Sequence, residues 1–167
     1  MAKNPIEEFI DNLPFFKEFS DAEREKMVNT SGIFEKYKAG NAIISEGETT
    51  AAVFVILKGT VAIQKEVKVD VTKDHISPQK QVGFTIKELK SGAIFGEISL
   101  ISQRPRNTSA IASSNQVVVM KITDKITEKF NFSIQRKIQN QLIQILVERL
   151  EDMNEKFINL KTSSLKT

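Results

Sequence analysis

The sequence contains no cysteine and only one histidine, His75, among its 167 residues. Without cysteine there is no disulfide framework, no thiolate metal site and no thiol nucleophile. This composition fits a reducing compartment, so we expect a cytoplasmic location. Small β-barrel enzymes that hold a metal typically use several histidines with a carboxylate, so a single histidine argues against that class. We interpret His75, which lies in a polar stretch, as a solvated loop residue.

Long hydrophobic runs are also missing. The longest run, Ala51 to Leu57, is far shorter than the roughly 20 residues that span a bilayer, and the N-terminal MAKNPIEEF lacks the apolar core of a signal peptide. We therefore expect a soluble chain with no membrane partner. The sequence has no nucleophile elbow and no Walker loop, so we expect a protein that is not an enzyme and assign no catalytic residue and no metal.

The charge distribution does not favour nucleic acid binding. The formal net charge is +3, but the lysines are scattered singly among acids and form no basic stripe with interleaved aromatic residues. We interpret them as solvated surface. With 40% hydrophobic and 27% charged residues, the chain has the composition of a soluble globular protein, and its length suits one domain with an appended helix.

The pattern of the sequence predicts helices at both ends and strands between them. Ser20 and Glu23 have the spacing of a capping box, which predicts a helix from Ser20 to about Gly32. Between Ile33 and Met120, short runs rich in Val, Ile, Phe and Thr alternate with glycines, which is typical of strands. The strands we expect are Ile43–Ile44, Val53–Leu57, Val61–Val71, Val82–Leu89, Thr108–Ala112 and Val117–Ile122. They predict a mainly β fold, a jelly roll or flattened barrel with flanking helices, in which Lys73–Gln81 is a surface turn.

From Thr123 the hydrophobic period becomes helical. The first apolar positions fall on one side of the helix: Ile126, Phe130, Ile134, Ile138, Leu142 and Ile145. A second set steps alternately by three and four residues, the spacing of a coiled coil: Ile143, Leu146, Leu150, Met153, Phe157 and Leu160. We expect the first set to lie on the barrel and the second to form a parallel homodimer. The alternative is that the whole helix is a lid on its own barrel.

The stretch FGEISLISQRPRNTSA, residues 95–110, contains the residues whose side chains and backbone could bind a ligand. Gly96 opens a short helical turn, whose first backbone N–H groups can be approached closely by an anion. Arg106 supplies a planar, permanently charged group that matches two phosphate oxygens. Glu97 is an acceptor suited to a ribose hydroxyl. These residue types predict a phosphate with a ribose attached, and the alternative is a helical turn with a surface Glu–Arg pair.

This stretch resembles the phosphate-binding cassette of the cyclic nucleotide-binding domain family. Phe95 to Leu100, Pro105-Arg106 and the small residues up to Ala110 carry the likeness. Segments upstream are similar in order to the leading helices and barrel of the family: Leu13–Phe16, the helix after Ser20, Tyr37–Gly40, Ile44–Gly47 and Phe54–Gly59. The resemblance covers residues from about 12 to 130. It implies an eight-stranded barrel that holds cAMP or cGMP and a following helix that transmits occupancy.

The resemblance also implies roles for the residues of the cassette. Gly96 and Ser99 would offer backbone N–H groups to the phosphate, Glu97 would hold the ribose and Arg106 would pair with the exocyclic oxygens. We add Ile98, Asn107 and Thr108 to the candidate site. The family often has a small residue or Ser/Thr and then Ala after the arginine, whereas Asn107-Thr108-Ser109 stands here. The absence of Ser or Thr directly after Arg106 favours cAMP over cGMP.

We therefore expect a cyclic nucleotide sensor with a binding domain at residues 1–130 and a C-terminal helix and tail at residues 131–167 that signals to a partner. The alternative is a degenerate domain that kept the barrel as an interaction module and lost the ligand. Only a short polar tail, Lys161 to Thr167, follows the helix, so we expect no DNA binding. The sequence leaves open whether the chain is free-standing or a fragment.

Overall fold

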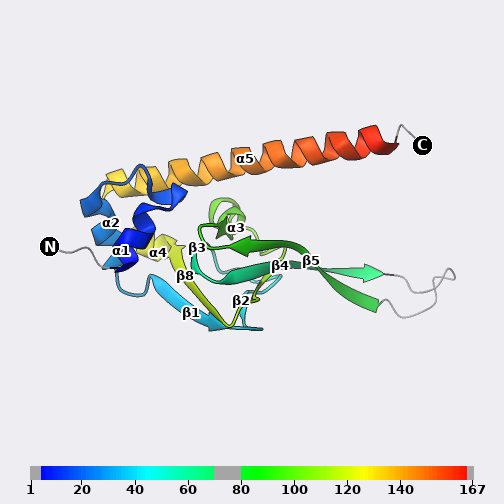
Figure 1. The fold of residues 1–167 in the computed structure, drawn as a ribbon, viewed down its shortest axis with the longest axis horizontal. Helices are drawn as coiled ribbons and strands as arrows, with labels where there is room; N and C mark the ends of the chain where they lie inside the picture. The colour runs from blue at the N-terminus through cyan, green and yellow to red at the C-terminus, as the bar shows by residue number, and fades with distance from the viewer. Residues whose placement is uncertain (1–4, 70–79, 165–167) are drawn as a thin grey trace. The chain divides into compact units, whose positions relative to one another are not determined.

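The computed structural model describes residues 5–69 and 80–164. The chain divides into two compact units, Met1–Lys129 and Phe130–Thr167, and each is described by itself. Over the described residues, the first unit contains short helices and eight strands. The second contains one long helix (Figure 1). The predicted turn at Lys73–Gln81 and His75 lie largely or wholly outside the described residues.

Three short helices lead into the strands: α1 (Pro5–Asp11), the 3-10 helix η1 (Pro14–Phe16) and α2 (Asp21–Val28). The predicted capping box is present, because Ser20 Oγ accepts from Glu23 N at 3.3 Å and Glu23 Oε2 accepts from Ser20 N at 2.8 Å. The helix ends at Val28, four residues before the predicted end. The residues that follow are Asn, Thr, Ser and Gly, which are poor helix formers, so they form a turn instead.

The eight strands form two four-stranded antiparallel sheets, which confirms the predicted fold class. The strands are β1 (Phe34–Lys38), β2 (Ala42–Ile44), β3 (Ala52–Lys58), β4 (Thr60–Val69), β5 (Lys80–Lys90), β6 (Ile94–Phe95), β7 (Ser109–Ala112) and β8 (Gln116–Thr123). The strand orders are β1-β8-β3-β6 and β2-β7-β4-β5. Two strands were not among those drawn from the sequence: β1, where charged residues interrupt the apolar pattern, and β6, which is only two residues long.

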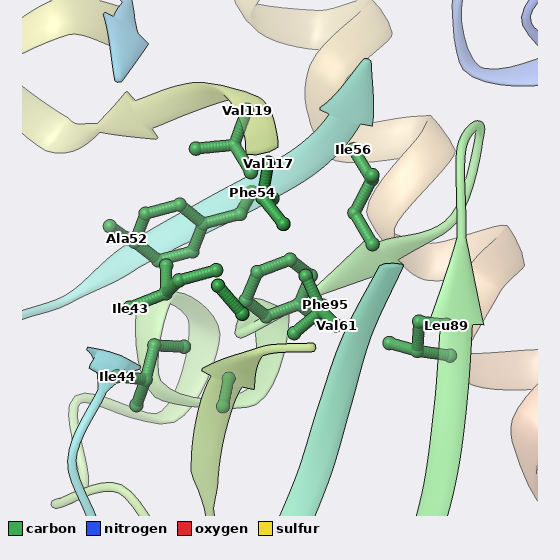
Figure 2. Close-up of a cluster of buried hydrophobic side chains, with 12 residues drawn as sticks. Ile43, Ile44, Ala52, Phe54, Ile56, Val61, Leu89, Phe95, Val117 and Val119 are labelled. Carbon is green, nitrogen blue, oxygen red and sulfur yellow. The ribbon is translucent and has the colours of Figure 1, made fainter. Parts of the chain in front are cut away.

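The core lies between the two sheets. Phe54 from β3 stacks on Phe95 from β6 with ring centroids 5.1 Å apart, and Val117 and Val119 from β8 lie near them (Figure 2). The opposite sheet contributes Ile43, Ile44, Val61, Leu89, Ala110 and Ala112 to the same cluster. Every residue of the β3 segment from Ala52 to Leu57 is buried, so β3 runs through the centre of the domain.

The chain after β8 forms the short helix α4 (Asp124–Thr127) and then α5 (Phe132–Ser164), a single helix of 33 residues. Thr123 caps α4, since its Oγ1 accepts from Ile126 N at 3.2 Å. The six predicted seam residues therefore all lie on one uninterrupted helix. The expectation that the first part of this helix lies on the barrel stays a prediction. No helix in the described residues is both long and apolar enough to cross a bilayer.

Candidate functional site

The predicted helical turn is present as α3 (Glu97–Ser102), between β6 and β7. Gly96 precedes it with φ +81°, in the left-handed region that favours glycine. A Cβ at this position would lie 2.8 Å from the carbonyl oxygen of Ala52 and 3.0 Å from Arg106 Nη1. Space and backbone conformation therefore both require glycine at the start of α3.

Arg106 is the cation of the site, and it is buried with 6% of its surface exposed. Its Nη1 donates to the carbonyl of Gly96 at 2.6 Å and its Nη2 to the carbonyl of Ala52 at 2.9 Å. Its Nε has no hydrogen-bond partner among the described residues. The guanidinium thus ties the residue that precedes α3 to the start of β3.

Two carboxylates lie near the guanidinium of Arg106. Burial lowers the pKa of Arg106, while the carboxylates of Glu48 and Glu97 act in the opposite direction. An arginine side chain remains charged at neutral pH because its pKa begins far above that range. Glu97 is 1% exposed, so a carboxylate and a guanidinium share one buried environment.

The residues of α3 differ in how they can contribute. Ser99 is 4% exposed and its Oγ donates to the carbonyl of Gly96 at 3.2 Å, so Ser99 and Arg106 share one acceptor. The side chain of Ile98 is 49% exposed. The structure thus brings Gly96, Glu97, Ser99 and Arg106 together, whereas Ile98 can contribute to this buried site through its backbone alone.

Asn107 and Thr108 lie in the segment between Arg106 and β7, where Asn107 is exposed and Thr108 is half-buried. Lys65 from β4 donates to the carbonyl of Asn107 at 2.7 Å and pairs with Glu46. The hydrogen bond from Lys65 lowers the pKa of the Glu46 carboxyl. Lys65 therefore holds the backbone directly after the arginine, a role that its interpretation as solvated surface had missed.

The loop between β2 and β3 supports the same segment through its backbone. Gly47 N donates to the carbonyl of Arg106, and Arg106 N donates to the carbonyl of Glu48, each at 2.8 Å. Glu46 N donates to Ser109 Oγ at 3.0 Å. In the sequence, residues 46 and 47 carry only a likeness to the family. Their contact with the arginine joins positions about 60 residues apart, which local patterns do not reveal.

Phe54 connects this site to a second polar group on β1 and β8. Its ring centroid lies 6.0 Å from Arg106 Cζ and 5.8 Å from Lys121 Nζ. Lys121 pairs with Glu35 at 3.0 Å, and the hydroxyl of Tyr37 donates to the same carboxylate. Within the described residues, no group of three or more histidine, aspartate or glutamate side chains could hold a metal ion.

The model of the cyclic nucleotide-binding domain family matches residues 34–130, more than half of the chain. The chain belongs to the cyclic nucleotide-binding domain family. The matched region contains every residue of the candidate site, from Gly96 to Thr108. The family model describes a ligand-binding regulatory domain, and this agrees with the resemblance seen in the sequence.

Curated relatives include a cGMP-dependent protein kinase and the regulatory subunit of a cAMP-dependent protein kinase. The chain is 30% identical over 126 residues to cGMP-dependent protein kinase 2 of Homo sapiens, covering 75% of the chain and 15% of the kinase. It is 32% identical over 107 residues to the cAMP-dependent protein kinase regulatory subunit of Mycosarcoma maydis, covering 64% of the chain and 18% of that protein. The chain thus spans less than a fifth of the length of these relatives.

Solved structures show the same fold. A cyclic nucleotide-binding domain from Methylobacillus flagellatus superposes with a TM-score of 0.68 at 22% identity, covering 92% of this chain and 80% of that one. The regulatory domain of Toxoplasma gondii protein kinase A in complex with cAMP gives a TM-score of 0.59 at 20% identity, covering 83% of this chain and 49% of that one.

Proposed function

We propose that this chain is a regulatory module that binds a cyclic nucleotide at the segment from Gly96 to Thr108. The observation that supports it best is the arrangement around Arg106, a buried guanidinium beside a buried carboxylate, next to a helix start that only glycine can form. A bare phosphate would gain nothing from Glu97, whereas a phosphate with a ribose attached gains a hydroxyl acceptor. The family of the chain supports the same ligand.

In this proposal, the phosphate of the ligand contacts N–H donors and the ribose contacts a carboxylate. The first N–H groups of α3, including that of Ser99, and the N–H of Gly96 face the phosphate, because a helix start carries partial positive charge. Arg106 pairs with the exocyclic phosphate oxygens, and Glu97 accepts from the ribose hydroxyl. Asn107 and Thr108 line the phosphate or the edge of the purine.

We propose cAMP as the preferred ligand. Asn107 stands directly after Arg106, where a Ser or Thr would suggest a contact to the amino group of guanine. Similarity to a cGMP-dependent protein kinase and to the regulatory subunit of a cAMP-dependent protein kinase is about equal, so it favours neither base. Competition between the two nucleotides tests this preference, and cGMP binding tenfold tighter or more would contradict it.

We further propose that residues 1–130 bind the ligand and that α5 carries the signal to a partner helix. The coiled-coil spacing of apolar residues on α5 suits pairing with another helix, either of a second copy or of a different protein. A cytoplasmic location is supported by the absence of cysteine.

The experiment is the melting temperature of the full chain with about 1 mM cAMP, cGMP or 5′-AMP. A ligand with a Kd of about 1 µM stabilises the folded state by about 4 kcal/mol at this concentration. We expect a rise with a cyclic nucleotide and little with 5′-AMP. The variant Glu97→Ala should weaken the ribonucleotide more than its 2′-deoxy analogue. No rise with either cyclic nucleotide would favour the alternative, a barrel that acts as an interaction module without ligand.

A further inference from the structure

The second half of α5 carries an apolar seam, which we define as Ile143, Leu146, Leu150, Met153, Phe157 and Leu160. The positions repeat every seven residues as two rows, 143-150-157 and 146-153-160, the a and d rows of a coiled coil. Five of these side chains are more than half exposed: Ile143 58%, Leu150 54%, Met153 62%, Phe157 58% and Leu160 72%. So large an apolar surface on one helix indicates a face that binds another element.

In the second half of α5, cations and acids lie on different faces of the helix. Arg149, Lys156 and Lys161 stand directly beside the seam, in the e and g rows that border a partner helix. The acids stand in the b, c and f rows, which face away from it: Glu148, Glu151, Asp152 and Glu155. Between residues 143 and 161, the borders of the seam thus carry three cations and no carboxylate.

Two of these cations, Lys156 and Lys161, contact neighbouring side chains on the same helix. Lys161 Nζ lies 5.4 Å from the centroid of the Phe157 ring, so its charge lies over the seam itself. Lys156 pairs with Asp152 one turn earlier at 2.7 Å. Both of these side chains are more than half exposed, and such pairs contribute little and exchange readily for a better partner.

The cations beside the seam disfavour pairing with a second copy of the chain. In a parallel pair, each g residue faces the e residue five positions later on the other helix, which sets Lys156 against Lys161 of the second copy and Arg149 against Asn154. In an antiparallel pair, g faces g, which sets the cations Arg149 and Lys156 against those of the second copy. Neither arrangement offers a carboxylate to the bordering cations, and like charges at such positions are destabilising.

We propose that the apolar seam of α5 binds a separate amphipathic helix whose bordering positions carry Asp or Glu. Such a helix pairs with all three cations while it covers the seam. An anionic membrane fits less well, because residues 143–161 carry four acids against three cations and the acids occupy the outer face. This inference rests on the proposed function, in that it names the class of partner to which α5 signals.

The test uses the full chain without nucleotide, so that its outcome is independent of ligand binding. The probes are two fluorescent peptides of about 25 residues with identical Leu/Ile heptads, one with Glu and one with Lys at every e and g position. Fluorescence anisotropy should show the Glu peptide binding about tenfold tighter, and the difference should shrink in about 1 M salt. The variant Arg149→Glu, Lys156→Glu, Lys161→Glu should reverse the preference.

A matched variant tests the seam itself. Leu150→Asn with Phe157→Asn leaves every charge in place and should abolish binding of the Glu peptide. Equal binding of the two peptides, binding of neither, or stronger binding to phosphatidylserine vesicles than to the Glu peptide would each overturn the proposal. A stable dimer of the unmodified chain at about 10 µM in sedimentation would overturn it too, because the seam would then be occupied by a second copy.

Discussion

The guanidinium of Arg106 joins Gly96 to Ala52. In the proposed function it also supplies the charge for the ligand. A buried cation is costly unless hydrogen bonds or opposite charges compensate it. Here two carbonyls and the nearby carboxylates of Glu48 and Glu97 do so. The site is therefore partly organised before any ligand arrives, which lowers the cost of binding.

The variant Gly96→Ala should destabilise the protein more than an ordinary glycine substitution. An alanine at φ +81° costs about 1–2 kcal/mol, and its Cβ would also collide with the Ala52 carbonyl, adding about 1–3 kcal/mol. The matched control is Gly40→Ala, at φ +83° with nothing within 4 Å of the added Cβ. Urea unfolding measures both variants. Equal losses of stability would contradict the close approach at Gly96.

Tyr37 should resist ionisation in the folded protein. Burial raises its pKa, and the hydrogen bond to Glu35 and the negative charges of Glu35 and Glu48 raise it further. An unfolded tyrosine ionises near pH 10, so folding stability should be intact below about pH 10 and fall above it. Tyr37 is the only tyrosine and the chain has no tryptophan, so tyrosinate absorbance reports this one group. A midpoint near 10 in the folded state would contradict the structure.

Residues that lie close in the sequence are the ones whose proximity could be predicted. Gly96, Glu97 and Arg106 lie within eleven residues, and the structure brings them together, while their roles toward a ligand stay predictions. The position of Lys65 could not be predicted, because its contact with Asn107 joins residues 42 positions apart on different elements. A single lysine on a strand carries no signal of a partner that only the fold supplies.

At the scale of elements, β4 and the loop between β2 and β3 support the segment that follows Arg106. The variant Lys65→Met keeps the aliphatic chain but removes the donor to the Asn107 carbonyl and the partner of Glu46. We expect its affinity for the cyclic nucleotide to fall about three- to tenfold, because the segment is no longer held.

The matched control for that prediction is Lys58→Met. Lys58 Nζ donates to Gln116 Oε1 at 3.1 Å, a contact of the same kind between β3 and β8 away from the cassette. Its affinity should equal that of the unmodified chain in equilibrium titrations. If Lys65→Met also binds with unchanged affinity, Lys65 has no positioning role.

A helix or strand could be predicted where its own residues carry a recognisable sequence pattern. The capping box located the start of α2, and the apolar run from Val53 located β3, which is buried along nearly its whole length. β1 was missed because three of its five residues are charged, and its pairing with β8 defines it as a strand. β6 has two residues and exists only through pairing with β3.

At the scale of the whole molecule, a barrel with a cassette is joined to a long helix with its own apolar seam. The sequence predicted both parts, but the apolar spacing alone suggested a homodimer. The cations that border the seam weigh against that partner. Their positions around the helix are defined because α5 continues through residue 164 without a break. Apolar periodicity predicts that a helix pairs, whereas the bordering charges select what it pairs with.

Calorimetric titration of cAMP into the unmodified chain and into Arg106→Ala tests the central claim most directly. We predict saturable binding to the unmodified chain with a Kd in the micromolar range or tighter. Arg106→Ala should lose about 1.5–3 kcal/mol of binding free energy, more than a tenfold change, because a charge-assisted contact to phosphate disappears. Circular dichroism at the same temperature establishes that the variant is folded. No heat at millimolar cAMP and cGMP, or a folded variant that binds as tightly as the unmodified chain, would contradict the account.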